Sequence, residues 1–190
     1  MRGMEQPRYR IRMGTEDDVA TAVAIDDAAS ALYAEVGIVF DSRAVAPMAA
    51  AEQKAWLGAA RAGGLLIAES DGDGSAAGFA AVTEKDGAAY LERISVVPAH
   101  MRRGVGRLLM LATCDLARRG GHREIWLTTY SHVPWNRPFY ARHGFVAVPE
   151  ESCGDGVRAV LAFQRACLPQ PGQRIVMRRF LADSAAAIPG

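Results

Sequence analysis

The sequence lacks both a strong excess of charge and any long apolar run. Its 22 basic and 21 acidic residues leave a net charge of +1. A nucleic-acid-binding protein usually carries a broad basic excess, so we expect no nucleic-acid partner. No apolar stretch reaches the roughly 20 residues that a membrane span needs, and the N-terminal MRGMEQPRYRIRMG has no apolar signal-peptide core. We therefore expect no membrane partner.

Cysteine is also scarce. Cys114, Cys153 and Cys167 are an odd number of thiols and show no C-x-x-C spacing. This pattern excludes a disulfide framework and gives no support to a zinc site. We expect reduced thiols, a cytoplasmic location and no bound metal.

What is present suits a folded enzyme-sized domain. Half of the 190 residues are hydrophobic and 23% are charged, which is the composition of a globular protein with a substantial core. There is no internal repeat or linker. We predict a single domain over residues 1–182, followed by a flexible tail over residues 183–190, where the sequence DSAAAIPG is small and polar.

Hydrophobic periodicity predicts an α/β fold. The first helix is expected from Thr15 to about Tyr33, the second from Pro47 to Gly63, the third directly after Gly104, and a short one over 137–143. The expected strands cover 9–13, 65–70, 76–84, 88–97, 123–130, 145–148, 157–163 and 174–181. The order is β-α-α-β-β-β-α-β-α-β-β, a mixed, mostly antiparallel sheet of about seven strands flanked by helices. The strands on either side of the third helix should be parallel.

A cationic glycine turn, PAHMRRGVGRLL, begins at Pro98 and leads into the third helix. Free amides and the positive end of the dipole make a helix start an anion site, and glycines let the anion approach the backbone. The dinucleotide motif G-x-G-x-x-G is incomplete because Leu109 stands at its third glycine, and Arg107-Leu108 does not fit the Gly-Lys-Ser/Thr of a P-loop. The alternative is an ordinary surface turn.

VVPAHMRRGVGRLL resembles the coenzyme-A-binding motif of the GCN5-related N-acetyltransferase (GNAT) superfamily, with Val96, Pro98, Gly104 and Gly106 in the matching positions. Met101 departs from the Arg or Gln expected there.

A second stretch, VPWNRPFYARHGFV, is similar to the late signature of the same family. Asn136, Tyr140, Gly144 and Phe145 match it. The resemblance extends over nearly the whole order of strands and helices.

The resemblance implies a GNAT-like sheet and acetyl-CoA as cosubstrate, with its pyrophosphate on the glycine turn and its pantetheine arm along the 88–97 strand. The implied coenzyme-binding residues are Ile94, Val96, Val97, Met101, Arg102, Arg103, Gly104, Val105, Gly106, Arg107, Asn136 and Tyr140. The alternative is a non-catalytic acyl-CoA-binding or sensor domain on the same fold.

Tyr140 is the candidate general acid, because a phenol with a pKa near 10 is neutral at pH 7 and can reprotonate a thiolate. Its alternative role is a core aromatic beside Phe139. Asn136 lies one helical turn earlier and can bind the coenzyme arm or serve as an N-cap.

Glu92 is the candidate base, acting directly or through a water, since it is an acid within an apolar strand. The alternative is a salt bridge with Arg93 or Arg12. His132 is a second candidate base on a loop.

The resemblance places the acceptor between the first two helices and the loop before the late helix. The candidates there are Tyr33, Glu35, Phe40, Trp56, His132 and Trp135. Aromatics with one carboxylate suit a cationic amine with an apolar body, although Trp56 and Phe40 can equally be core residues. The acceptor is expected to be a small-molecule or peptide amine, with polyamine, aminoglycoside, amino acid and protein N-terminus all open. A homodimer is compatible with the sequence.

Overall fold

The computed structural model describes residues 8–181, so the expected tail over 183–190 lies outside the described part of the chain. The helices and strands run in the order β1 (Tyr9–Met13), α1 (Val19–Ser30), α2 (Ser42–Arg61), β2 (Leu65–Ser70), β3 (Ala76–Lys85), β4 (Ala88–Val96), α3 (Val105–Arg119), β5 (Glu124–Tyr130), α4 (Arg137–Arg142), β6 (Val146–Val148), α5 (Asp155–Cys167) and β7 (Arg174–Phe180). Among the described residues, no helix is long and apolar enough to cross a membrane.

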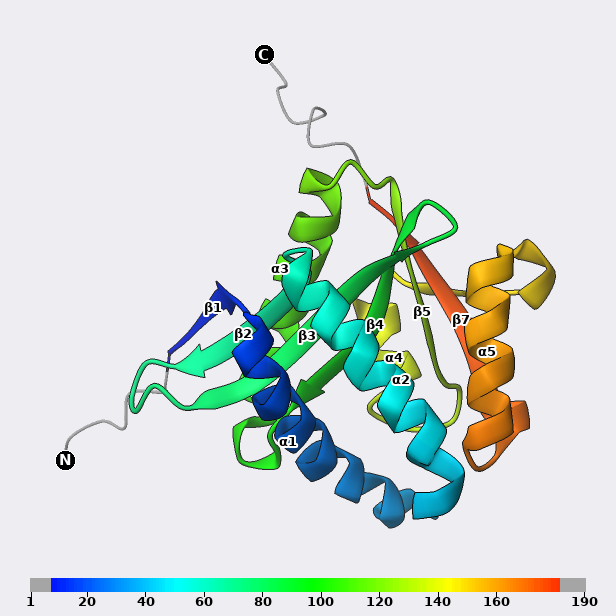
Figure 1. Ribbon diagram of the computed structural model, residues 1–190, viewed down its shortest axis with the longest axis horizontal. Helices are drawn as coiled ribbons and strands as arrows, with labels where there is room; N and C mark the ends of the chain where they lie inside the picture. Colours follow the sequence, from blue (N-terminus) through cyan, green and yellow to red (C-terminus); the bar gives the residue numbers. More distant parts are fainter. Residues whose placement is uncertain (1–7, 182–190) are drawn as a thin grey trace.

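The strands form one seven-stranded sheet in the order β1-β2-β3-β4-β5-β7-β6. All neighbours are antiparallel except β4 and β5, which are parallel as expected across α3. The predicted fold class is therefore confirmed. Strands β4 and β5 pair only at Ala89–Ile125 and Tyr90–Trp126, although both continue for several residues beyond. They diverge past that point, and Figure 1 shows α4 between them in the view.

Helices cover both faces of the sheet (Figure 1). Along β2, Leu66 and Ala68 pack with α3 on one face, while Leu65 and Ile67 pack with α1 and α2 on the other. This alternation is what a strand buried on both sides requires. Helix α5 packs on β5 and β7 through Leu161 and neighbours.

Helix α2 begins earlier than predicted. Asp41 is its N-cap, and its carboxylate accepts hydrogen bonds from the amides of Arg43 (2.9 Å) and Ala44 (2.8 Å). Pro47 is therefore inside the helix and does not open it. The missing proline amide leaves the carbonyl four residues earlier, at Arg43, without its helical hydrogen bond. Arg43 is exposed, so water can satisfy that carbonyl. The first helix also differs, since residues 31–36 are 3-10 helix and end at Gly37.

The segment Val157–Phe163, predicted as a strand, is the middle of α5. Its buried residues, Val157, Leu161 and Gln164, follow helical spacing. Asp86, from the turn between β3 and β4, accepts hydrogen bonds from the amides of Gly156 (2.8 Å) and Val157 (3.0 Å). This distant carboxylate satisfies the free amides at the start of α5, a contact that local sequence does not reveal.

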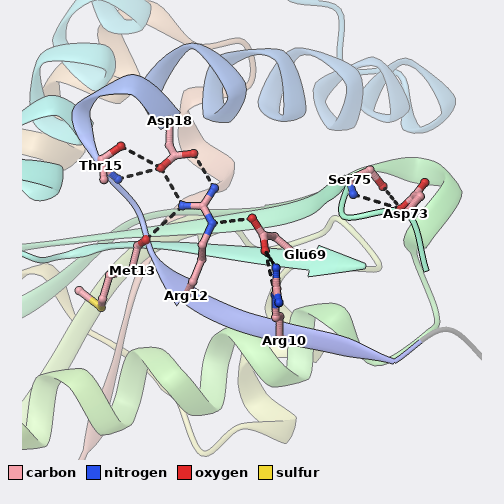
Figure 2. Close-up of polar contacts among 8 residues, drawn as sticks. All are labelled: Arg10, Arg12, Met13, Thr15, Asp18, Glu69, Asp73 and Ser75. Atoms are coloured by element: carbon pink, nitrogen blue, oxygen red, sulfur yellow. Dashed lines mark hydrogen bonds and ion pairs between the residues drawn. The ribbon is translucent and has the colours of Figure 1, made fainter. Parts of the chain in front are cut away.

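A network of charged side chains fixes β1 to β2 and to the chain entering α1 (Figure 2). Arg12 binds both oxygens of Asp18, at 2.8 and 2.7 Å, and one oxygen of Glu69 at 2.5 Å. Arg10 binds the other oxygen of Glu69 at 2.7 Å. Asp18 also accepts the amide of Thr15 at 2.8 Å, which confirms the predicted capping box. Arg12, one of the two arginines considered as an alternative partner of Glu92, is thus engaged with Asp18 and Glu69.

Candidate active site

The start of α3 has the geometry of an anion site. Gly104 adopts a left-handed conformation (φ 87°). The first helical hydrogen bond runs from the amide of Leu108 to the carbonyl of Gly104 at 3.0 Å. The amides of residues 105–107 therefore have no intrahelical acceptor. Arg102, Arg103 and Arg107 are exposed around this turn. The amide of Met101, by contrast, donates to the carbonyl of Pro98 at 3.2 Å.

The two sequence motifs meet at Gly106. A Cβ added there would lie 3.4 Å from Cε2 of Phe139 in α4 and 3.8 Å from Cγ2 of Val96 in β4. Ile94 and Val96 face the core on the α3 side, and Val105 is buried in it. Val97 packs instead against the core cluster on the α1 side. Consequently α3, α4 and the end of β4 meet around Gly106.

Strand β4 contains a bulge at Glu92. Ala81 pairs with Arg93 and the next residue, Val82, pairs with Leu91, so Glu92 is an extra residue without a partner. A bulge leaves its extra residue outside the ladder and redirects side chains. Glu92 and Arg93, although consecutive, therefore both have polar partners away from the α3 core. The bulge lies just beyond the point where β4 and β5 separate.

Glu92 forms a salt bridge, as its alternative interpretation allowed, but with a partner that was not foreseen. One carboxylate oxygen accepts hydrogen bonds from the Lys85 ammonium at 2.5 Å and from the Thr83 hydroxyl at 2.6 Å. Its side chain is 9% exposed. Its second oxygen makes no hydrogen bond with residues 8–181, so the group keeps a free acceptor.

Arg93 lies between two carboxylates that the sequence did not indicate. It hydrogen-bonds Glu52 of α2, and its Nε lies 3.4 Å from Oδ1 of Asp26 in α1. Ser95 donates to the same Asp26 oxygen at 2.6 Å. Burial raises the pKa of Glu52, the charge of Arg93 opposes that rise, and Asp26 adds to it. With both acids ionised, the three charged groups carry a net charge of −1 beside the bulge.

Asn136 and Tyr33 tie α4 to the segment after α1. The Asn136 amide nitrogen donates to the Tyr33 hydroxyl at 3.0 Å, while the Asn136 side chain makes no capping bond to its own helix. Tyr140 packs between Phe139 and Phe145, with ring centroids 5.3 and 5.9 Å away. Its hydroxyl makes no hydrogen bond within residues 8–181, and burial raises its pKa above the ordinary value of 10.

Most of the acceptor candidates come together around Tyr33. Its ring is 5.5 Å from Phe40, 5.8 Å from Trp135 and 6.0 Å from Tyr130, and Tyr130 is 5.7 Å from His132. His132 is exposed and Trp135 is 36% exposed. These rings form an aromatic group at the end of β5.

Two acceptor candidates do not join this group through any described contact. Trp56 is 2% exposed and packs edge-to-face against Phe79, with ring centroids 4.9 Å apart, in the core under α1 and α2. It is therefore a core residue, because an indole without accessible surface cannot line a pocket. Glu35 is exposed.

Sequence reasoning missed Asp26, Glu52, Ser95 and Tyr130. It named Arg93 only as a possible partner of Glu92, whereas Arg93 pairs with Glu52 and Asp26. A signal for the environment of Arg93 was present, since Glu92-Arg93 puts consecutive charges into an apolar strand, and such a pair indicates a bulge. Asp26 and Glu52 come from two different helices, and only the tertiary fold brings them to Arg93. Residues 8–181 contain no group of three or more His, Cys, Asp or Glu positioned to hold a metal ion.

Comparisons with known proteins agree with this geometry. A model of the acetyltransferase (GNAT) family matches residues 21–145. The streptothricin acetyltransferase of Streptomyces lavendulae is 42% identical over 57 residues, which are 29% of this chain and 30% of that protein. The alignment thus spans less than a third of that relative.

Solved structures share the fold. The PaiA N-acetyltransferase from Thermoplasma acidophilum, in complex with coenzyme A, has a TM-score of 0.66 at 15% identity and covers 91% of this chain and 99% of its own. A GNAT-family acetyltransferase from Staphylococcus aureus Mu50 has a TM-score of 0.67 at 14% identity, covering 92% and 100%. The ribosomal-protein-S18-alanine N-acetyltransferase from Escherichia coli has 0.61 at 17%, covering 96% and 100%. Because the family match extends over more than half of the sequence, the chain belongs to the acetyltransferase (GNAT) family.

Proposed function

We propose that this protein transfers an acetyl group from acetyl-CoA to a primary amine of a small molecule or peptide. The observation that carries the proposal is the convergence of three features: the open amides at the start of α3, the ends of β4 and β5 that are not paired with each other, and the Tyr140 hydroxyl without a partner in residues 8–181. The cosubstrate supplies an activated acyl group and a thiolate leaving group. Everything else must come from the chain.

The residues present fit this cosubstrate. The amides of residues 105–107 and the left-handed Gly104 offer its pyrophosphate a cradle in which Arg102, Arg103 and Arg107 add charge. The backbone of β4 beyond Tyr90 has no partner in β5, so it can pair with the pantetheine arm near Ile94 and Val96. An added Gly106 Cβ would be in van der Waals contact with Phe139 at 3.4 Å, so α3 and α4 meet directly beside the turn.

The chain also has residues for both proton transfers in the reaction, one to the leaving thiolate and one from the attacking amine. Because burial raises its pKa, Tyr140 keeps its proton at neutral pH and can donate it to a leaving thiolate. The attacking amine must be unprotonated. Glu92, which keeps one free oxygen, is the proposed acceptor of its proton, directly or through a water; His132 is the second candidate.

The acceptor side combines aromatic rings with the two carboxylates at Arg93, whose cluster has a net charge of −1 when both acids are ionised. This combination suits a cationic amine. The match to streptothricin acetyltransferase supports a small-molecule amine, and streptothricin therefore belongs among the first compounds to test. Use of acetyl-CoA supports a cytoplasmic location, which we also propose. A homodimer remains a prediction for sedimentation measurements.

The test is release of free thiol from acetyl-CoA in the presence of amines: streptothricin, polyamines, aminoglycosides, amino acids and peptides. Acetylation should depend on the amine and on Tyr140. Calorimetry should show coenzyme binding to the wild type and weaker binding to Gly104→Val. Coenzyme binding without turnover on any amine would instead support the acyl-CoA-binding alternative.

A further inference from the structure

Arg174 is a buried cation without an acidic partner. It begins β7 and is 7% exposed. Its Nη2 donates to Oε1 of Gln164 at 2.6 Å and to the hydroxyl of Thr128 at 3.2 Å, and its guanidinium lies 4.7 Å from the centre of the Tyr130 ring. Within residues 8–181, no carboxylate forms an ion pair with it. Burial lowers the pKa of this guanidinium, yet an arginine stays charged at neutral pH.

Two other partly buried arginines of the sheet do have acidic partners. Arg93 binds Glu52, and Arg178, on the same strand and face as Arg174, lies 3.7 Å from Glu124. Buried charges are normally paired because removing a charge from water is unfavourable. An arginine has five N–H donors, and the partners of Arg174 engage only Nη2. Its Nε is shielded from solvent and has no acceptor, and its Nη1 makes no hydrogen bond with residues 8–181.

The unsatisfied guanidinium is next to the acceptor candidates. The Tyr130 ring over which it lies also contacts Tyr33 and His132. On its other side, Thr128 is 2.9 Å from the hydroxyl of Tyr90, and Tyr90 precedes Glu92 by two residues. At a strand rise of about 3.3 Å per residue, these two are only about 7 Å apart along β4. The acceptor side thus has a positive pole at Arg174.

We propose that Arg174 binds a carboxylate of the acceptor. The negative pole of the acceptor side is formed by Glu92 and by the two acids that contact Arg93, Asp26 and Glu52. An acceptor that presents its amine to these acids and its carboxylate to Arg174 satisfies both poles. The acceptor class is then amino acids and related compounds that carry a primary amine and a carboxylate. This inference rests on the proposed acetyl transfer.

The experiment compares acceptors that differ only by the carboxylate. Lysine is paired with 1,5-diaminopentane and ornithine with 1,4-diaminobutane. Each compound is measured in the presence of coenzyme A by thermal stabilisation, and with acetyl-CoA by KM and turnover. A hydrogen-bonded charge pair predicts that the carboxylated member has a KM about 10- to 100-fold lower and stabilises the protein more.

Arg174→Gln should remove this preference, so that the KM of the carboxylated member rises to about that of its diamine, because the charge that binds the carboxylate is gone. Arg174→Lys keeps the charge but lacks the paired N–H donors of a guanidinium, so it should retain part of the preference. It also shows whether the loss in Arg174→Gln reflects folding. Arg178→Gln is the matched control, and should keep the wild-type preference.

Turnover with no preference for the carboxylated member, or a preference that survives in both Arg174 variants, overturns the carboxylate site and leaves acetyl transfer intact. Preferential stabilisation by lysine and ornithine that is lost in Arg174→Gln, without turnover on any amine, supports the carboxylate site and overturns the proposed reaction.

Discussion

Tyr140→Phe should separate catalysis from folding. The Tyr140 hydroxyl makes no hydrogen bond within residues 8–181, and the packing against Phe139 and Phe145 belongs to the ring, which phenylalanine keeps. The free energy of unfolding should therefore change by no more than about 0.5 kcal/mol. Turnover should fall about 10²- to 10⁴-fold, the usual contribution of a positioned general acid, which is equivalent to about 3–5 kcal/mol of barrier.

The assay is thiol release at saturating acceptor, with urea unfolding and coenzyme calorimetry on the same preparations. Tyr9→Phe is the matched control. The Tyr9 hydroxyl bonds Nδ1 of His100 at 3.0 Å, so this variant should lose about 0.5–1.5 kcal/mol of stability and keep its turnover. The two tyrosines should thus show opposite patterns.

The pH dependence adds a second check. Burial raises the pKa of Tyr140 above 10, so the acid stays protonated throughout an assay between pH 6 and about 9.5. Any rise or fall of turnover with pH in that range must come from titration of the proton acceptor or of the amine. The same pH dependence should persist in Tyr140→Phe. Normal turnover in Tyr140→Phe would refute its role as the acid. A large loss of stability would refute the interpretation of its hydroxyl as unpaired.

Three further results are expected. Gly104→Ala should lower the free energy of unfolding by about 1 kcal/mol, since left-handed strain of about 1–2 kcal/mol exceeds the entropic gain of about 0.4–1 kcal/mol. Gly106→Ala, at a position with ordinary φ, should cause no such loss. Equal losses of the two variants in urea unfolding would contradict this reasoning. Glu52 has a pKa raised by burial, so its native state holds the proton longer and stability falls as pH rises from about 4.5 towards the folded pKa; Glu52→Gln should flatten that slope, and exposed Glu151→Gln should not. Asp86 (φ 54°) has a pKa lowered by its bonds to the α5 amides, so Asp86→Ala should lower Tm more than Asp86→Asn, which tolerates positive φ and keeps an acceptor; equal Tm values would exclude the capping role.

The fold was predictable where one pattern dominated. The strands of the central hairpin and the crossover through α3 follow from clear periodicities and turn residues, and the structure confirms them. The prediction was wrong at 157–163, because valines and a leucine at helical spacing also suit a strand, and the contact that favours the helix start comes from Asp86, about 70 residues away. At Pro47, the rule that proline opens helices misplaced the boundary, because the Asp41 cap lies earlier.

The candidate site divides in the same way. The glycine turn and the Asn136–Tyr140 pair lie on contiguous segments, and Gly106 and Phe139 show that these segments meet. The acids around Arg93 come from α1 and α2, and the partners of Arg174 come from β5 and α5. No local pattern joins such residues. The salt bridge of Glu92 was anticipated as a type of contact, whereas its partner, Lys85, depends on the register of the hairpin.

Strand β4 separates the two substrates of the proposed reaction. On one face Ile94 and Val96 pack towards α3, beside the coenzyme turn. Without the bulge, strict alternation would place Glu92 and Arg93 on opposite faces, and one of these charges would enter the α3 core. The extra residue instead lets both take polar partners on the acceptor side. The bulge therefore concentrates charge at the point where β5 departs and where an amine on one face can reach an acyl group on the other.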